Sequence, residues 1–121
     1  MLKNGKPQLV IGAPGGQRIP TGVLQVMLDV LDFDRPLDQA IAAPRFHLRR
    51  PTSSDESPNL IDIDHETDGE VETALKGQGW KPNRRPNGEF YFGAVNAAVI
   101  RGDGTIFGVA DKRRTGDAEG N

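Results

Sequence analysis

The residues most able to do chemistry are the glycine pair Gly15-Gly16, in a glycine-rich connection between an expected strand and an expected helix. Glycine lets a backbone come close to a ligand, and N–H groups at a helix N-terminus carry partial positive charge. Such donors hold a phosphate, a carboxylate or a developing oxyanion. The pair is therefore a candidate anion or oxyanion site, although the spacing alone favours a plain strand-to-helix turn.

Two common phosphate motifs are excluded by the same stretch of sequence. A phosphate loop needs Lys and then Ser or Thr after its glycines, whereas Gln17 and Arg18 follow here. Gly12, Gly15 and Gly16 also lack the G-x-G-x-x-G spacing of a dinucleotide fingerprint.

The histidines and acidic residues supply no convincing catalytic or metal-binding group. His47 and His65 fit no metal-ligand spacing, and neither has a nucleophile nearby in the sequence. The acidic cluster over 62–68 lacks the pattern of a calcium loop, so a solvated strand end followed by a helix start explains it better. No metal and no cofactor is expected.

The basic residues also have simple explanations. The segment 111–114, Asp-Lys-Arg-Arg, is typical of an ion-pairing turn after a strand. Arg84-Arg85, near Trp80 and Tyr91, is too sparse for a nucleic-acid platform. Fifteen basic residues against seventeen acidic residues give a net charge of -2, so no nucleic-acid partner is expected.

Composition narrows the class of protein further. The 121 residues include 15 Gly and 9 Pro, which excludes long helices and coiled coils, and the lack of Cys excludes disulfides and thiol catalysis. Polar residues interrupt the longest apolar-rich segment, 19–31, so no membrane contact is expected. Residues 1–5 lack a signal-peptide pattern, and no compartment is assigned. With 36% hydrophobic and 6% aromatic residues, the chain is either a thin-cored domain or part of a larger one.

The N-terminal third contains the elements that position the glycine pair. Asn4-Gly5 predicts a tight hairpin turn before a strand over 8–13, with an N-terminal arm so short that we expect the chain to start inside a larger fold. Pro20 suits the first turn of a helix predicted over 19–31. Because this helix is apolar over most of its circumference, it is expected to need cover on more than one side.

The rest of the chain predicts mixed α and β elements with antiparallel pairing. The strand over 59–64 alternates as a half-buried strand does, and a helix over 68–76 is expected to point Val71, Ala74 and Leu75 inward. Residues 101–104 predict a hairpin turn, and the tail after residue 114 is expected to be loose. The other predicted elements are a helix over 37–43, a strand over 45–49, a surface loop over 50–58, and strands over 91–100 and 105–110.

Taken in order, these segments closely resemble the gamma-glutamyltransferases. The small subunit of that family carries a similar strand, a G-[SA]-P-G-G-x-R-I turn and a V-L-Q-V helix, matched here by residues 12–19 and 23–26. The likeness covers almost the whole chain and is weakest between Arg49 and Leu60. The chain departs from the family pattern at Lys112 and Asn121, where Pro and Tyr are usual. Further matching segments are 32–33, 37–47, 77–80, 93–95 and 108–116.

The resemblance implies an α+β fold, part of an N-terminal-nucleophile hydrolase αββα sandwich with antiparallel sheets. The chain is interpreted as a single fragment, the C-terminal part of the small subunit. Its expected divisions are a strand, oxyanion turn and helices over 1–48, a loop over 49–58, a strand-helix-hairpin unit over 59–114 and a tail over 115–121.

The resemblance also implies transfer or hydrolysis of γ-glutamyl groups from glutathione and related amides, by a Thr that self-cleavage exposes at a new N-terminus. By position, Gly15 and Gly16 inherit the backbone N–H groups that bind the substrate oxyanion in the family. The family's nucleophilic Thr lies upstream of this turn, and neither Thr21 nor Thr115 replaces it. We therefore expect this chain to be inactive alone.

The partners implied are the remainder of the small subunit and the large subunit of the same precursor, or a second copy in their absence, together with a γ-glutamyl small molecule. Members of the family are often periplasmic, secreted or membrane-anchored. The alternative interpretation is a non-catalytic αβ module that self-associates or binds an anion at the Gly15-Gly16 turn.

Overall fold

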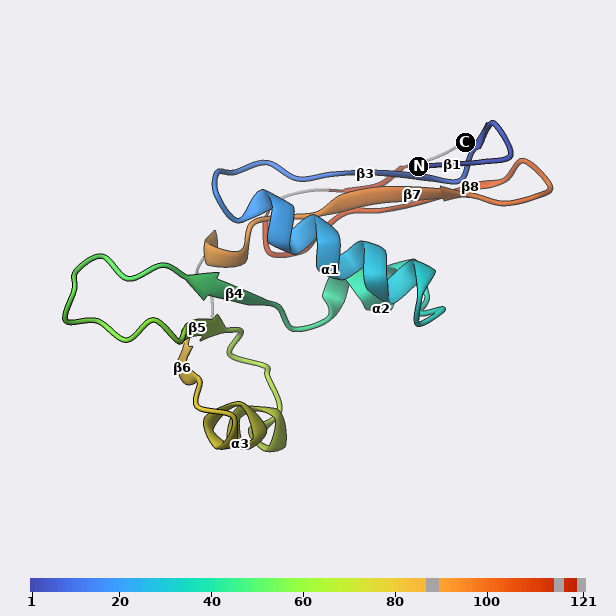
Figure 1. Ribbon diagram of the computed structural model, residues 1–121. Coiled ribbons are helices and arrows are strands. Elements are labelled where there is room, and N and C mark those ends of the chain that lie inside the picture. Colours follow the sequence, from blue (N-terminus) through green and yellow to red (C-terminus); the bar gives the residue numbers. More distant parts are fainter. Residues whose placement is uncertain (87–89, 115–116, 120–121) are drawn as a thin grey trace. The chain divides into compact units, whose positions relative to one another are not determined.

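The computed structural model describes residues 1–86, 90–114 and 117–119, and it separates the chain into two units (Figure 1). Unit 1 comprises Met1–Ala43 and Gly93–Asn121, and unit 2 comprises Pro44–Phe92. Nothing in the sequence indicated this division. Of the predicted tail, residues 115–116 and 120–121 lie outside the described residues.

Unit 1 begins with the predicted hairpin. Strands β1 (Leu2–Lys3) and β2 (Lys6–Pro7) pair antiparallel. Asn4 and Gly5 adopt positive φ angles of 53° and 74°, as the central residues of a type I′ turn do. The Asn-Gly prediction is therefore confirmed.

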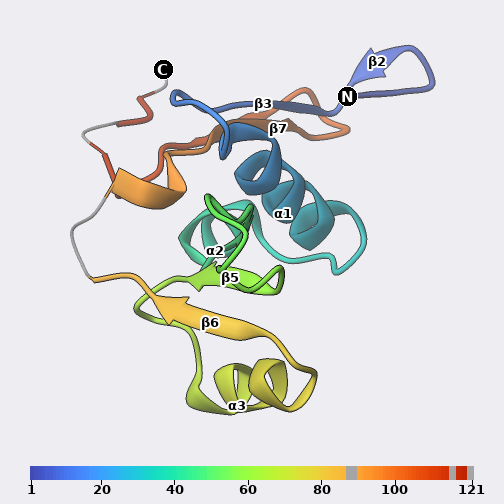
Figure 2. The same ribbon diagram turned by 60° about the vertical axis from the view of Figure 1, so that its left-hand side comes forward.

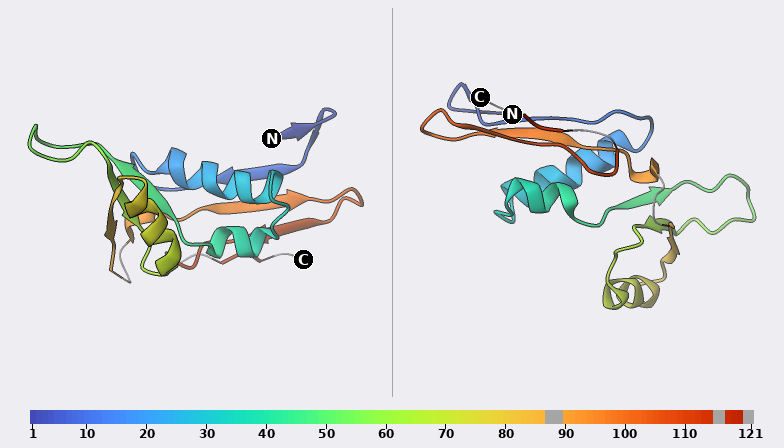
Figure 3. Two further views of the ribbon diagram at one scale, coloured as in Figure 1. Left: turned by 60° about the horizontal axis from the view of Figure 1, so that its bottom comes forward. Right: turned by 180° about the vertical axis from the view of Figure 1, so that it is seen from behind.

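A three-stranded antiparallel sheet forms the centre of unit 1. Its order is β3 (Leu9–Gly12), β7 (Asn96–Ile100) and β8 (Ile106–Val109), with Gly12 opposite Asn96 at the end nearest the glycine pair. At the other end of β7, residues 101–104 form the predicted hairpin turn, closed by a hydrogen bond of 2.9 Å from the Arg101 N–H to the Thr105 carbonyl. Figure 3 shows this hairpin in two views.

Two helices cover one face of that sheet (Figure 2). They are α1 (Ile19–Leu31), with the expected bounds and Pro20 in its first turn, and α2 (Leu37–Ala42), which follows Pro36. The core between helices and sheet consists of Leu9, Val26, Leu37, Ala40, Ile41, Val95 and Ala97.

Helix α1 is covered on one side only within unit 1. Val26 faces the core and is 1% exposed, whereas Leu24 is 53% exposed and Leu28 and Leu31 are each 40% exposed. The second apolar side predicted for this helix therefore exists, and it lies open in the described residues.

Unit 2 is built on a second three-stranded sheet. Its order is β4 (Phe46–Arg49), β5 (Leu60–Ile63) and β6 (Lys81–Arg84), and helix α3 (Gly69–Gly77) lies between β5 and β6 in the chain. Strands β4 and β5 are antiparallel as expected, but β5 and β6 are parallel. The Asp68 side chain caps α3 by accepting a 2.8 Å hydrogen bond from the Glu70 N–H.

Three predictions about local structure are wrong. Asp62 and Asp64 are 0% and 2% exposed, so β5 does not alternate between core and solvent; Asn83 and Tyr91, from distant segments, bond to the Asp62 carboxylate. On α3, Val71 is 50% exposed and Ala74 is also exposed, while Leu75 is half-buried, because unit 2 supplies little cover for this face. The strand predicted over 91–100 begins only at Asn96, since residues 90–92 form a short 3-10 helix, η1 (Phe90–Phe92).

Candidate functional site

The Gly15-Gly16 turn leads directly into α1. Gly15 has a φ of +140°, a conformation that L-residues with a side chain rarely adopt. The Gly16 carbonyl accepts a 3.1 Å hydrogen bond from the Ile19 N–H, and the Arg18 carbonyl accepts the first helical bond, 3.0 Å from the Gly22 N–H. The two glycines therefore lie within one turn of the helix N-terminus.

The electrostatic field of this turn favours an anion. The helix N-terminus carries partial positive charge from unsatisfied N–H groups, and α1 has no acidic residue in its first turn and no side-chain cap. Among the residues that the structure describes, neither the Gly15 nor the Gly16 N–H donates a hydrogen bond to another protein group. These two donors are therefore open to a ligand.

The turn also leaves space for a ligand. Both glycines are exposed, and a Cβ at Gly16 would meet no atom within 4 Å. A Cβ at Gly15 would lie 3.7 Å from the Ile19 Cγ1, which is an ordinary contact. A small anionic group can thus approach the backbone N–H groups from outside unit 1.

A buried polar cluster lies at the same end of the sheet. Asp111, which is 2% exposed, accepts hydrogen bonds of 3.0 Å from the Val95 N–H and from the Arg113 N–H. The Arg113 guanidinium lies 3.4 Å from the Asp111 carboxylate and donates 3.0 Å bonds to the carbonyls of Ile41 and Ala43. The ion-pairing turn predicted over 111–114 is thus confirmed for this pair, but its contacts with Val95 and with α2 were not predicted.

Unit 2 holds a second buried carboxylate, which has a structural explanation. Asp62 accepts a 2.6 Å hydrogen bond from the Asn83 side chain and a short one from the Tyr91 hydroxyl, and the Arg49 Nε lies 3.9 Å away. The Arg85 guanidinium lies 4.1 Å from the centre of the Tyr91 ring. These contacts join β4, β5, β6 and η1.

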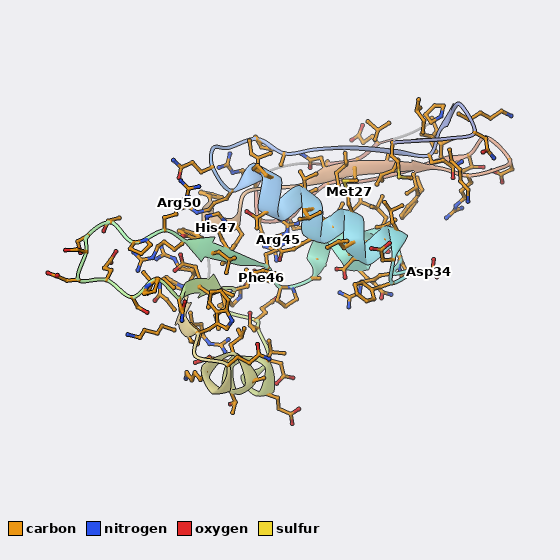
Figure 4. All side chains as sticks on the ribbon, viewed as in Figure 1. Met27, Asp34, Arg45, Phe46, His47 and Arg50 are labelled. Atoms are coloured by element: carbon orange, nitrogen blue, oxygen red, sulfur yellow. The ribbon has the colours of Figure 1, made fainter. Side chains whose placement is uncertain are left out.

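The histidines lie in unit 2. His47 is on β4, next to Phe46, as Figure 4 shows. His65 follows β5, and its Nδ1 lies 2.8 Å from Asp64 Oδ1. Asp64, His65 and Glu66 each place one ligand atom within 4.8 Å of the others. The Asp64 carboxylate also accepts a 3.3 Å bond from the Glu66 N–H, so it belongs to the turn that follows the strand.

The threonines that were not expected to act as nucleophiles are placed as follows. Thr21 lies in the first turn of α1, where its carbonyl accepts a 2.9 Å bond from the Gln25 side chain. Thr115 lies outside the described residues. No helix among the described residues is long and apolar enough to cross a membrane.

The chain is similar to one family of known proteins along its whole length. The profile of the family described as Gamma-glutamyltranspeptidase matches residues 1–121. Glutathione hydrolase proenzyme 1 of Schizosaccharomyces pombe is 31% identical over 114 residues, which are 94% of this chain and 17% of the relative. Glutathione hydrolase proenzyme of Pseudomonas aeruginosa is 49% identical over 47 residues, which are 39% of this chain and 8% of the relative.

Solved structures show the same fold. The gamma-glutamyltranspeptidase of Pseudomonas nitroreducens, solved in complex with L-DON, matches with a TM-score of 0.81 and 28% identity, over 100% of this chain and 59% of the solved chain. The T380A mutant of the Helicobacter pylori enzyme matches with a TM-score of 0.76 and 33% identity, over 94% of this chain and 58% of the solved chain. The predicted α+β class, within the N-terminal-nucleophile hydrolase fold, is confirmed. The chain spans less than a fifth of the first precursor relative and under two thirds of these solved chains.

Proposed function

Because the chain belongs to the gamma-glutamyltranspeptidase family, we propose that its Gly15-Gly16 turn supplies oxyanion-binding N–H groups for transfer or hydrolysis of γ-glutamyl amides such as glutathione. The observation that carries this proposal is the pair of open backbone donors at the N-terminus of α1. The names of the relatives, glutathione hydrolases and gamma-glutamyltranspeptidases, supply the substrate class.

The proposed chemistry is acyl transfer. A nucleophilic hydroxyl attacks the γ-glutamyl carbonyl, and the carbonyl oxygen acquires negative charge in the tetrahedral intermediate. The N–H groups of Gly15 and Gly16 donate hydrogen bonds to that oxygen, and the adjacent helix N-terminus adds favourable potential. Removing one such donor typically slows turnover by about 10²–10³-fold.

The turn stabilises charge but carries no nucleophile, so the proposal requires a second part of the enzyme. By the family resemblance, a Thr from another segment of the precursor attacks the substrate. We therefore expect residues 1–121 alone to release no product from γ-glutamyl p-nitroanilide.

The open side of α1 supports assembly with such a segment. Leu24, Leu28 and Leu31 are spaced four and three residues apart and therefore form one stripe along the helix. Exposed apolar stripes commonly mark interaction surfaces. In the proposed enzyme, another part of the same precursor covers this stripe.

The test is a grafted enzyme, in which these 121 residues replace the matched segment of the Pseudomonas nitroreducens enzyme. The grafted enzyme should hydrolyse γ-glutamyl p-nitroanilide, whereas the 121-residue chain alone should not. Gly16→Val keeps the backbone N–H but places a side chain in the open space beside it, so the oxyanion cannot approach and kcat should fall by about 10²–10³-fold, as when one donor is lost. Gly102→Val is the matched control, because a Cβ at Gly102 also meets nothing within 4 Å but lies in the hairpin turn at the other end of β7.

Two results would contradict the proposal. The first is turnover by the isolated chain that survives Gly16→Val. The second is a grafted enzyme that folds and turns over substrate equally well with Val at position 16. A chain that forms a stable dimer and binds phosphate, but gives no activity in a correctly folded graft, would support the non-catalytic module instead.

A further inference from the structure

A buried carboxylate outside the Gly15-Gly16 turn, that of Asp111, is hydrogen-bonded to the backbone just after Gly93, which lies beside Pro14. Asp111 lies just after β8 and is 2% exposed. Its two oxygens accept from different backbone groups: Oδ2 from the Val95 N–H and Oδ1 from the Arg113 N–H, each at 3.0 Å. Its own N–H donates a 3.2 Å bond to the Asn96 side chain. Asp111 therefore fixes the backbone at the start of β7 through both its side chain and its main chain.

The side chain of Arg113 links Asp111 to the end of helix α2. The Arg113 guanidinium donates to the carbonyls of Ile41 and Ala43, which are at the C-terminal end of that helix. Cations at a helix C-terminus satisfy the last carbonyls and are stabilised by the helix dipole. The Asp111 carboxylate is thus held between the helix layer and the strand that it orients.

Near the residue that Asp111 holds, the chain comes close to Pro14. Gly93 has a φ of +71°, and a Cβ there would be 3.6 Å from the carbonyl oxygen of Pro14, the residue before Gly15. Ala94 and Val95 are 2% and 1% exposed, so this segment is enclosed. The register of the sheet also brings the two segments to the same end, since Gly12 at the end of β3 pairs with Asn96 at the start of β7.

From these contacts we infer that Asp111 is a positioning residue for the Gly15-Gly16 turn. It holds the Val95 N–H, Gly93 two residues earlier lies beside the Pro14 carbonyl, and Pro14 directly precedes the two glycines whose N–H groups it orients. This inference rests on the proposed function, because it assigns Asp111 a role in orienting the oxyanion donors. Such donors act in the transition state only if their direction is fixed beforehand.

Asp111→Asn is the direct test. An amide offers one acceptor oxygen and presents an N–H donor where the second carboxylate oxygen stood, so one of the two backbone donors loses its acceptor. Asp103→Asn is the matched control: Asp103 also accepts from a backbone N–H, that of Thr105 at 2.9 Å, but it lies in the hairpin turn at the other end of β7.

The first readout is the amide NMR spectrum of the isotope-labelled 121-residue chain, which requires no activity. Asp111→Asn should shift the amide resonances of Val95, Gly93, Gly15 and Gly16, whereas Asp103→Asn should shift Thr105 and leave the glycine turn unchanged. A folded Asp111→Asn chain in which Val95 shifts but Gly15 and Gly16 do not would overturn the inference.

A milder variant keeps the test decisive if Asp111→Asn does not fold. Asn96 is exposed, and Asn96→Ala removes only the acceptor of the Asp111 N–H. The same shifts at Gly15 and Gly16 are expected, with smaller amplitude. Unchanged glycine resonances in this folded variant would likewise overturn the inference.

The second readout is the division between kcat and KM in the grafted enzyme. Asp111→Asn should lower kcat about ten-fold or more with KM nearly constant, because a misdirected donor weakens binding of the transition state rather than of the substrate. Asp103→Asn should leave both unchanged.

If Gly16→Val abolishes turnover but Asp111→Asn changes neither kcat nor the glycine resonances, only the role of Asp111 fails. If Gly16→Val has no effect, the proposed function itself fails.

Discussion

The side-chain amide of Asn83 on β6 donates a 2.6 Å hydrogen bond to the carboxylate of Asp62, which is its direct neighbour across the parallel β5–β6 pair. Asp62 is 0% exposed, so its charge depends on such donors for the solvation that water would otherwise provide. This contact links β5 and β6 through two residues that are 21 positions apart in the sequence.

Removing this donor should destabilise unit 2. We expect Asn83→Ala to lower the free energy of unfolding by about 1–3 kcal/mol, because a buried charged acceptor loses a partner. Urea unfolding followed by the fluorescence of Trp80, the one tryptophan of the chain, reports on this unit. Asn59→Ala is the control, since its exposed side chain donates a 3.3 Å bond to the Gly79 carbonyl. Equal losses for the two variants would show that the Asp62 contact is not a special source of stability.

Alanine should affect the two turn glycines differently. Gly15→Ala must hold a side-chain residue at a φ of +140°, which costs about 1–3 kcal/mol. Gly16→Ala should change stability by no more than about 0.5 kcal/mol, since its Cβ meets nothing within 4 Å. Far-UV circular dichroism during urea unfolding measures both, and a Gly16 variant as unstable as the Gly15 variant would contradict the turn geometry.

The stripe on α1 should matter only in the assembled enzyme. We expect Leu24→Ser to leave the isolated chain within about 0.5 kcal/mol of its parent, because Leu24 is 53% exposed there, and to lower the melting temperature of the grafted enzyme. Val26→Ala, at a position 1% exposed, should cost about 1–3 kcal/mol in both forms. If Leu24→Ser has no effect on the graft, no partner covers this side of the helix.

The loop before β5 should respond to acid. Hydrogen bonds from Thr52 hold the pKa of the Glu56 carboxyl below the ordinary value of 4.5. The bond from the Thr52 backbone N–H has the larger effect, and the bond from its hydroxyl has the next largest. Because the pKa of Glu56 is lower in the folded chain than in the unfolded chain, its charged carboxyl stabilises the fold fully at any pH above the ordinary pKa. This stabilisation is lost as the pH falls through the lowered pKa of the folded chain. An NMR titration should show the Thr52 amide and the Glu56 carboxyl titrating together below pH 4.5. A Glu56 midpoint at or above that pH would contradict the contact.

Helix α1 was predictable from the sequence because its signals are local. Pro20 favours a first helical turn, and the apolar run ends near Asp32, so the predicted bounds 19–31 agree with the structure. Strand β6 was missed for the opposite reason. It contains Pro82 and no apolar alternation, and it forms because β5 pairs with it at the edge of the sheet, where proline is tolerated.

Side-chain burial was the hardest feature to predict. The pattern over 59–64 placed Asp62 toward solvent, yet Asn83 and Tyr91 enclose it from 21 and 29 residues away. At the candidate site, the sequence located Gly15-Gly16 before α1. It contained no sign that Val95 and Asp111, 16 residues apart, are hydrogen-bonded, or that Gly93 lies beside Pro14. Such pairings depend on tertiary structure and leave no periodic trace.

The most direct measurement concerns the affinity of the grafted enzyme for a tetrahedral analogue, a γ-glutamyl substrate whose reacting carbonyl is replaced by a boronic acid. If Gly15 and Gly16 bind the oxyanion, the side chain of Gly16→Val blocks the space beside these N–H groups and should raise the inhibition constant of this analogue about 10²–10³-fold, while the dissociation constant of glutamate changes less than about three-fold. Gly102→Val, in the hairpin turn at the other end of β7, should change neither constant. Equal weakening of both ligands by Gly16→Val, or no weakening of the tetrahedral one, would contradict an oxyanion site at this turn.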